Sequence, residues 1–128
     1  MSAIEVRGLC PIKGEITVQG SKNAVLPMMA GAVLNNGITV INNVPRIQDV
    51  FCMMGILDSL GCSCVLDGHS LTIDAAGLSR FSIPKAEMEK MRSSIMLLGA
   101  LLGRCKEAEV YYPGGCMIGK RPIDLHLM

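Results

Sequence analysis

Residues 45–73 read PRIQDVFCMMGILDSLGCSCVLDGHSLTI, and this stretch decides the fold class. Its first half predicts a helix from Pro45 to Gly61, because apolar side chains recur at the spacing of one helical face. That face consists of Ile47, Val50, Phe51, Met54 and Leu57, with Asp49 and Asp58 on the other side. Its second half predicts two strands, over 63–66 and 71–73, on either side of Asp67-Gly68, a dipeptide typical of hairpin turns. The stretch therefore indicates a chain that mixes helices with paired strands.

The segments on either side continue this mixture. Before it, the pattern predicts strands over 4–6 and 15–18, a helix over 24–34 with Pro27 near its first turn, and a strand over 38–41. After it, the pattern predicts a helix over 85–105, a strand over 109–112 and a last helix that begins at Pro122. Because strand-to-helix junctions recur, we expect an α/β fold (α+β in some schemes) with mixed strand pairing and no linker.

The composition excludes several classes of protein. Of the 128 residues, 50% are apolar and 18% are charged, which excludes a disordered chain. A formal net charge of +1 and the absence of Trp argue against nucleic acid as a partner. The longest apolar runs, 24–34 and 95–103, are shorter than the ~18 residues of a membrane span, and no signal peptide opens the chain. We therefore expect a cytoplasmic protein that has no membrane partner.

Five of the six cysteines have apolar neighbours, and we expect them to be small buried side chains. They are Cys10, Cys52, Cys62, Cys64 and Cys105. Because the sequence has no Cys-x-x-Cys pair and no histidine at ligand spacing, we expect neither disulfides nor a metal, and no cofactor. Cys116 differs, because it lies in a glycine-rich loop directly before Lys120 and Arg121, and nearby positive charge makes a thiol reactive. The alternative is an incidental loop cysteine.

Cations stand at the start of two predicted helices. Lys22 lies one or two residues before the first helix, and Lys120 and Arg121 lie before the last. A helix N-terminus carries a positive partial charge, so cations there indicate a bound anion, with solvated surface residues as the alternative. Asp124 is expected in the first turn of the last helix, either as an ordinary helix-start residue or as an acceptor for a ligand hydroxyl.

Arg92 is the first residue of a short polar cluster, Arg92-Ser93-Ser94, in an otherwise apolar predicted helix. A buried arginine needs a partner, because an unpaired buried charge costs several kcal/mol. The partner is either Glu87 or Glu89 in a salt bridge, or a ligand, unless the side chain still lies in solvent.

Three collinear motifs carry a resemblance to a known family. They are GSKNAVLP at 20–27, MRSS at 91–94 and GGCMIGKRPIDLH at 114–126. Together they resemble the UDP-N-acetylglucosamine enolpyruvyltransferase family from about residue 4 to the end, and the third motif is highly specific. Since that family is several times longer than this chain, we expect an N-terminal fragment.

The resemblance implies a transferase that moves the enolpyruvyl group of phosphoenolpyruvate to the 3-hydroxyl of UDP-N-acetylglucosamine, the first committed step of peptidoglycan synthesis. It also implies a pair of inside-out α/β barrels built of βαβαββ units, of which only the first unit and the start of the next are present. Residues 1–21 would then be strands of the second barrel, and residues 22–128 the beginning of the barrel that carries the catalytic loop.

The resemblance also implies roles for single residues. Lys22, Asn23 and Arg121 would hold phosphoenolpyruvate, and Cys116 would protonate its methylene carbon and react with fosfomycin. The UDP-sugar would contact Arg92, Arg121, Pro122, Ile123, Asp124 and Leu125. The family's base for the sugar hydroxyl lies in its second half, so we expect this chain to be inactive alone and to self-associate through its uncovered apolar surface. The alternatives are the related shikimate enzyme, 3-phosphoshikimate 1-carboxyvinyltransferase, and a non-catalytic anion-binding module of the same fold.

Overall fold

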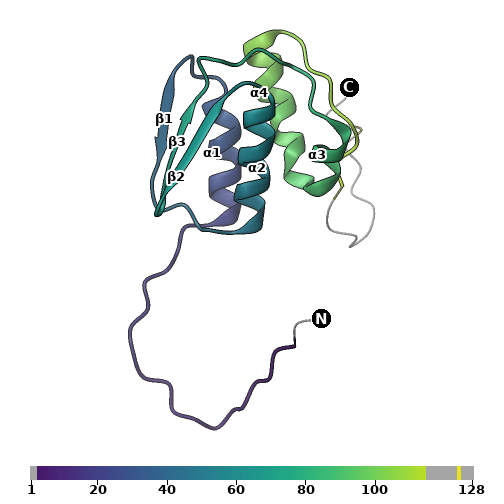
Figure 1. Cartoon of the computed structure of the whole chain (residues 1–128). Coiled ribbons are helices and arrows are strands. Elements are labelled where there is room, and N and C mark those ends of the chain that lie inside the picture. The colour runs from purple at the N-terminus through teal and green to yellow at the C-terminus, as the bar shows by residue number, and fades with distance from the viewer. Residues whose placement is uncertain (1–2, 115–123, 125–128) are drawn as a thin grey trace.

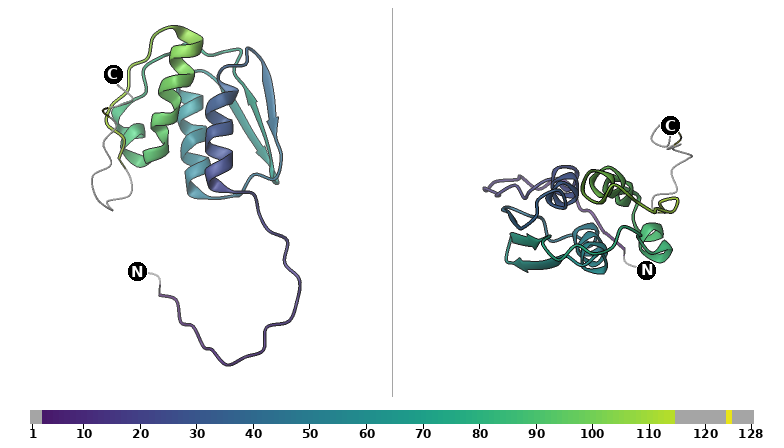
Figure 2. Two further views of the ribbon diagram at one scale, coloured as in Figure 1. Left: turned by 180° about the vertical axis from the view of Figure 1, so that it is seen from behind. Right: turned by 90° about the horizontal axis from the view of Figure 1, so that it is seen from above.

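The computed structural model describes residues 3–114 and residue 124. Its helices and strands are α1 (Lys22–Ala32), β1 (Ile38–Ile41), α2 (Gln48–Ser59), β2 (Ser63–Asp67), β3 (Ser70–Asp74), α3 (Lys85–Lys90), the 3-10 helix η1 (Arg92–Ile95) and α4 (Met96–Cys105). The sheet forms one layer, α1 and α2 cover one of its faces, and α3 and α4 lie on the far side of these helices (Figures 1 and 2). The mixture of helix and strand that the sequence predicts is confirmed.

The three strands form one antiparallel sheet in the order β1-β3-β2. Leu71 and Ile73 of β3 and Ile41 of β1 point into the core, whereas Val40 and Val65 are exposed on the other face, as the two-residue period of a strand requires. The expectation of mixed pairing is wrong for these strands. The strand predicted over 109–112 is reduced to a single parallel bridge between Ser82 and Glu109.

The hairpin between β2 and β3 confirms the predicted pair of strands but moves its turn by one residue. Asp67 pairs with Ser70, so the two turn residues are Gly68 and His69 rather than Asp67 and Gly68. Gly68 has φ 56°, a left-handed conformation that glycine adopts at little cost. The carbonyl of Gly68 accepts a hydrogen bond from Arg46 (3.0 Å), and the carbonyl of His69 accepts one from the Val44 amide (2.8 Å). These bonds attach the turn to the loop that leads into α2.

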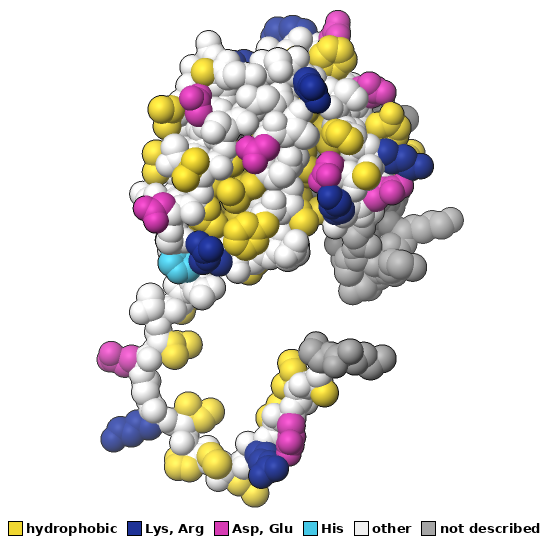
Figure 3. All heavy atoms as spheres, viewed as in Figure 1, with side chains coloured by type: hydrophobic (Ala, Val, Ile, Leu, Met, Phe, Trp, Pro, Cys, Tyr) yellow, Lys and Arg dark blue, Asp and Glu magenta, His cyan; other side chains and the backbone are white. Residues whose placement is uncertain are grey.

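The strands predicted over 4–6 and 15–18 are not formed. Residues 3–20 contain no strand, and their apolar side chains lie in solvent; Ile16, for example, is 90% exposed (Figure 3). A strand needs a neighbour to accept its backbone hydrogen bonds, and the described part of the chain offers none beside this segment. The alternating pattern therefore indicated a capacity for pairing that these residues do not use here.

Helix α2 buries a different face from the one that the spacing predicts. Val50 and Leu57 are buried as predicted, but Met53 and Ile56 complete the face, and Phe51 is 40% exposed. Because α2 contacts α1, α3 and β2, its buried surface is wider than a single stripe. The Arg46 guanidinium instead lies over the Phe51 ring, with its central carbon 5.8 Å from the ring centroid.

The long helix predicted over 85–105 is broken at Met91. This residue is extended, with φ −151° and ψ 127°, so α3 ends at Lys90 and η1 begins at Arg92. The buried hydroxyl of Ser94 donates to the carbonyl of Met91 (2.6 Å) and contacts that of Met88 (3.4 Å). Serine hydroxyls that bond nearby carbonyls compete with regular helix bonds, which accounts for the break.

Two of the helices, α1 and α4, carry apolar residues on more than one side. Leu26, Met29, Leu97 and Leu101 are buried in the common core, whereas other apolar residues of the two helices are exposed. The exposed ones include Met28, Met96 and Leu102. None of the helices described is both long enough and apolar enough to span a bilayer.

Candidate functional site

Helices α1 and α2 and the η1–α4 segment all begin at the same end of the molecule (Figure 1). Lys22 opens α1, Gln48 opens α2 and Arg92 opens η1, so these residues stand at starts that share one end of the molecule. Aligned N-termini place unpaired backbone N–H groups and positive partial charge at this end. Two of the three opening residues are cations, so this end of the molecule can hold an anion.

Lys22 is the first residue of α1 rather than a residue before it, which corrects the expected helix start. Ser21 is extended, and its carbonyl accepts the first helical bonds from Ala24 and Val25. Gly20 lies against Asn43 so closely that a Cβ at position 20 would be 1.9 Å from the Asn43 carbonyl oxygen. Only glycine fits this contact, which holds the start of α1 beside the loop that leads to α2.

The Lys22 ammonium forms an ion pair with the carboxylate of Asp49, in the first turn of α2. The Lys22 side chain is 50% exposed and the Asp49 side chain 30% exposed. The lysine is therefore held by a neighbouring helix and still open to solvent. The sequence placed Asp49 only on the polar side of its helix and did not single it out, because its partner depends on how the helices pack.

Asn23 is exposed in the first turn of α1, next to Lys22. Pro27, four residues later, lies inside the helix rather than at its first turn. Because proline has no N–H, it cannot give the Asn23 carbonyl the usual helical hydrogen bond. The missing bond lies on the side of Asn23 that faces along the helix towards Pro27, whereas its exposed side chain can meet a ligand at this end of α1.

Arg92 is half-buried at the start of η1, directly after the extended Met91. The two acids offered as its salt-bridge partners both pair with lysines: Glu87 with Lys90 (2.8 Å) and Glu89 with Lys85 (3.7 Å). The helix break places Arg92 at a helix start, where the sequence had placed it within a continuous helix.

The chain returns to this end at Gly114. Its amide donates a hydrogen bond to the Met88 carbonyl (3.0 Å), the same oxygen that the Ser94 hydroxyl contacts. A Cβ at position 114 would lie 1.9 Å from the Glu89 carbonyl oxygen, so this contact requires glycine. The structure thus attaches the beginning of the GGCMIGKRPIDLH motif beside α3 and η1.

The rest of that motif lies almost wholly outside the described residues. Asp124 is described and exposed. The other predicted residues that fall outside are Cys116, Lys120, Arg121, Pro122, Ile123 and Leu125. Their assigned roles stay predictions.

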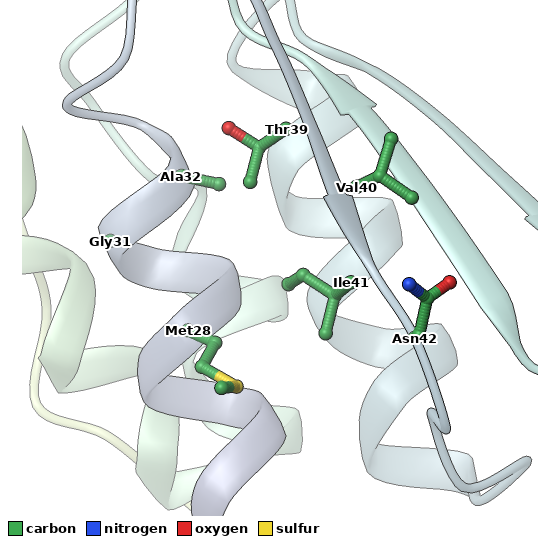
Figure 4. A pocket seen from close by; sticks show the side chains of 7 residues that line it. All are labelled: Met28, Gly31, Ala32, Thr39, Val40, Ile41 and Asn42. Atoms are coloured by element: carbon green, nitrogen blue, oxygen red, sulfur yellow. The ribbon is translucent and has the colours of Figure 1, made fainter.

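An open groove of about 410 Å³ runs between α1 and the free side of β1 (Figure 4). Met28, Thr39 and Val40 line it together with Ile41 and Asn42, and no titratable side chain is among the lining residues. A second groove, of about 320 Å³, lies between α2 and α3 and includes Gln48, Phe51, Glu87 and Lys90. The first groove lacks the charge that an anionic metabolite needs.

The cysteines differ in burial more than their neighbours suggested. Cys62 is buried, but Cys52, Cys64 and Cys105 are half-buried and Cys10 is exposed, so the expectation is wrong for Cys10. Burial, together with the charge of Asp58, raises the pKa of Cys64 to about 12, and burial also raises the pKa of Cys62. Both thiols are therefore protonated at neutral pH and unreactive. Across residues 3–114 and Asp124, His, Cys, Asp and Glu side chains do not form a group of three that could hold a metal ion.

Comparison with known proteins agrees with this arrangement. Residues 6–128 match the EPSP synthase (3-phosphoshikimate 1-carboxyvinyltransferase) family. The chain belongs to this family. It is 45% identical over 127 residues to UDP-N-acetylglucosamine 1-carboxyvinyltransferase 2 of Caldanaerobacter subterraneus subsp. tengcongensis and 43% identical over 127 residues to UDP-N-acetylglucosamine 1-carboxyvinyltransferase of Desulfatibacillum aliphaticivorans.

These alignments cover 99% of the chain but only 30% of each relative, so the chain spans less than a third of the curated relatives it matches. Among solved structures, it is similar to the enolpyruvyl transferase NikO from Streptomyces tendae, with a TM-score of 0.66 and 25% sequence identity. That similarity covers 70% of this chain and 21% of NikO. These comparisons establish the family for residues 6–128 and its fold for the 70% of the chain that matches NikO.

Proposed function

We propose that the whole protein transfers the enolpyruvyl group of phosphoenolpyruvate to the 3-hydroxyl of UDP-N-acetylglucosamine and releases phosphate. The observation that carries the proposal is that Lys22 and Arg92 open helical segments that begin at the same end of the molecule, and that Gly114, just before Cys116 in the sequence, is bound to α3 beside the start of η1. The names of the 45% and 43% identical relatives support UDP-N-acetylglucosamine rather than shikimate 3-phosphate as the acceptor.

In this proposal the cations hold the anionic groups of phosphoenolpyruvate. Lys22, Asn23 and Arg121 bind the phosphate and carboxylate, and the aligned N–H groups at the helix starts add to the positive potential. Arg92, Arg121 and residues 122–125 contact the UDP-sugar. The anion binds here because positive groups are already gathered and need little rearrangement.

Cys116 gives its proton to the methylene carbon of phosphoenolpyruvate, and the neighbouring carbon becomes oxocarbenium-like. The sugar hydroxyl attacks that carbon and loses its proton to a base that the family places in its second half. Loss of phosphate and of one methyl proton then restores the carbon–carbon double bond in the product. A positioned proton donor typically contributes ~10²–10⁴-fold to the rate.

The test measures phosphate release by the whole protein from phosphoenolpyruvate with either UDP-N-acetylglucosamine or shikimate 3-phosphate. Cys116→Ser should lose most turnover, whereas Cys116→Asp should retain it and lose alkylation by fosfomycin. Cys10→Ser, which changes an exposed thiol in the N-terminal segment, serves as the control. Phosphate release with shikimate 3-phosphate but not with UDP-N-acetylglucosamine would contradict the proposal. Equal fosfomycin labelling of the wild type and Cys116→Asp would contradict it as well.

We also propose that residues 22–74 are one βαβαββ unit of an inside-out barrel that lacks its first strand. The order α1-β1-α2-β2-β3 supports this, as does the outer side of β1, which pairs with no strand among residues 3–114. Residues 1–21 then belong to the second barrel, in agreement with the exposure of residues 3–19 in the described part of the chain. The exposed apolar residues of α1 and α4 would make the isolated 128-residue chain self-associate, and a concentration-independent monomer in size-exclusion chromatography would contradict this.

A further inference from the structure

The ion pair between Lys22 and Asp49 joins the first turns of two helices. Asp49 is not among the residues that the proposed function assigns to phosphoenolpyruvate or to the UDP-sugar. Its carboxylate is nevertheless the described group that fixes the ammonium assigned to phosphoenolpyruvate. The two helices pack against each other, and this packing keeps together the two first turns that carry the pair.

Lys22 needs such a partner for a physical reason. A cation in the first turn of a helix faces the positive end of the helix dipole, which disfavours it. A free lysine side chain also has many rotamers, and a ligand that fixes it must overcome the loss of that conformational entropy. Asp49, by contrast, is favoured where it lies, because an acid in the first turn of α2 faces the positive end of that helix dipole. Its side chain is also short and therefore has few rotamers.

The ion pair leaves room for a ligand. An ammonium group has three N–H donors, so one directed at Asp49 leaves two for an anion. The Lys22 side chain remains 50% exposed with the pair formed. Asp49 can therefore orient the ammonium while the substrate binds it from the open side.

We propose that Asp49 is a positioning residue for phosphoenolpyruvate: it holds the Lys22 ammonium at the start of α1 and shares it with the substrate anion. The inference rests on the proposed function. It deepens that function by naming the group that keeps the lysine in place before the substrate arrives.

The kinetic test compares Asp49→Asn, Asp49→Glu and the wild type in the whole protein. Asp49→Asn should raise the KM for phosphoenolpyruvate by about 10- to 100-fold, the range of effects expected when a reacting or binding group is displaced by about 1 Å. The KM for UDP-N-acetylglucosamine should change less than about 2-fold, and Asp49→Glu should recover part of the loss. Glu107→Gln removes the same charge from an exposed position after α4 and should leave both constants unchanged.

A second measurement detects the ion pair directly and needs no activity assay. A zero-length carbodiimide reagent should form an amide between Lys22 and Asp49, detected by mass spectrometry, and saturating phosphoenolpyruvate should leave this cross-link in place. Absence of the cross-link, or its loss with phosphoenolpyruvate, would overturn the shared-ammonium arrangement. An unchanged KM in an active Asp49→Asn protein would overturn the inference alone, whereas a wild type that releases no phosphate would overturn the proposed function and this inference with it.

Discussion

Replacing Gly114 by alanine should disable the proposed reaction while leaving the fold intact. The new Cβ would lie 1.9 Å from the Glu89 carbonyl oxygen, and Cβ atoms are essentially never found within 3.0 Å of a heavy atom from a residue that is not adjacent in the chain. The obstacle is backbone, at the end of α3, so it cannot rotate away as a side chain would. The chain at position 114 must therefore move by about 1 Å, and its hydrogen bond to the Met88 carbonyl must lengthen or break.

The two consequences differ in size. Loss of one hydrogen bond changes the free energy of unfolding by only about 0.5–1.5 kcal/mol. A displacement of about 1 Å just before Cys116 acts on the proton donor itself, and misplacement of that size can cost about 10²-fold in rate. We therefore expect kcat/KM of the whole protein to fall about 100-fold with little change in its unfolding.

The assay is phosphate release from phosphoenolpyruvate and UDP-N-acetylglucosamine, with urea denaturation of the same samples. Gly37→Ala is the matched control, because a Cβ at position 37 meets nothing within 4 Å. Should Gly114→Ala keep wild-type kcat/KM, the contact with Glu89 does not position the catalytic segment and the reasoning fails.

Three further predictions concern stability. Arg104→Met should lower the free energy of unfolding by about 1–2 kcal/mol in urea denaturation, since the guanidinium bonds Asn36 (2.7 Å) beyond the end of α1; unchanged unfolding would contradict it. Leu57→Ala, at a fully buried position, should cost about 2–5 kcal/mol by the same measurement, and a loss under 1 kcal/mol would show a loosely packed core. Stability should decline from pH 9 towards 12, because the Cys64 thiol loses its proton near pH 9 when unfolded but near 12 when folded; Cys64→Ala should flatten this decline.

Much of the fold follows from local patterns. The hairpin over 63–74 was predictable because a polar dipeptide with glycine separates two short runs of strand-forming residues. The turn itself moved by one residue because the bonds from Val44 and Arg46 hold Gly68 and His69, and these partners are distant in the sequence. Local propensity therefore predicts the strands, whereas tertiary contacts determine their register.

The break at Met91 could not be predicted by the same means. Residues 85–105 have no proline, and their helical spacing continues through the break. What interrupts the helix is the buried Ser94 hydroxyl, which bonds the carbonyls of Met91 and Met88, and the Gly114 amide, which uses the Met88 carbonyl as well. The signal lay in the polar pair Ser93-Ser94 inside an apolar segment, although from the sequence alone this pair was only part of a polar cluster with Arg92.

The candidate site shows the same division. Lys22 was singled out because a cation is unfavourable at a helix start, and Arg92 because a charge in an otherwise apolar helix needs a partner. Asp49 was not singled out, because an acid in the first turn of a helix is favourable and therefore ordinary. Its role depends on two helices beginning at the same end, an arrangement fixed in part by the contact of Gly20 with Asn43. A residue that relieves an unfavourable charge is thus found only after packing identifies its partner, so the inferred role of Asp49 stands or falls with the placement of α1 against α2.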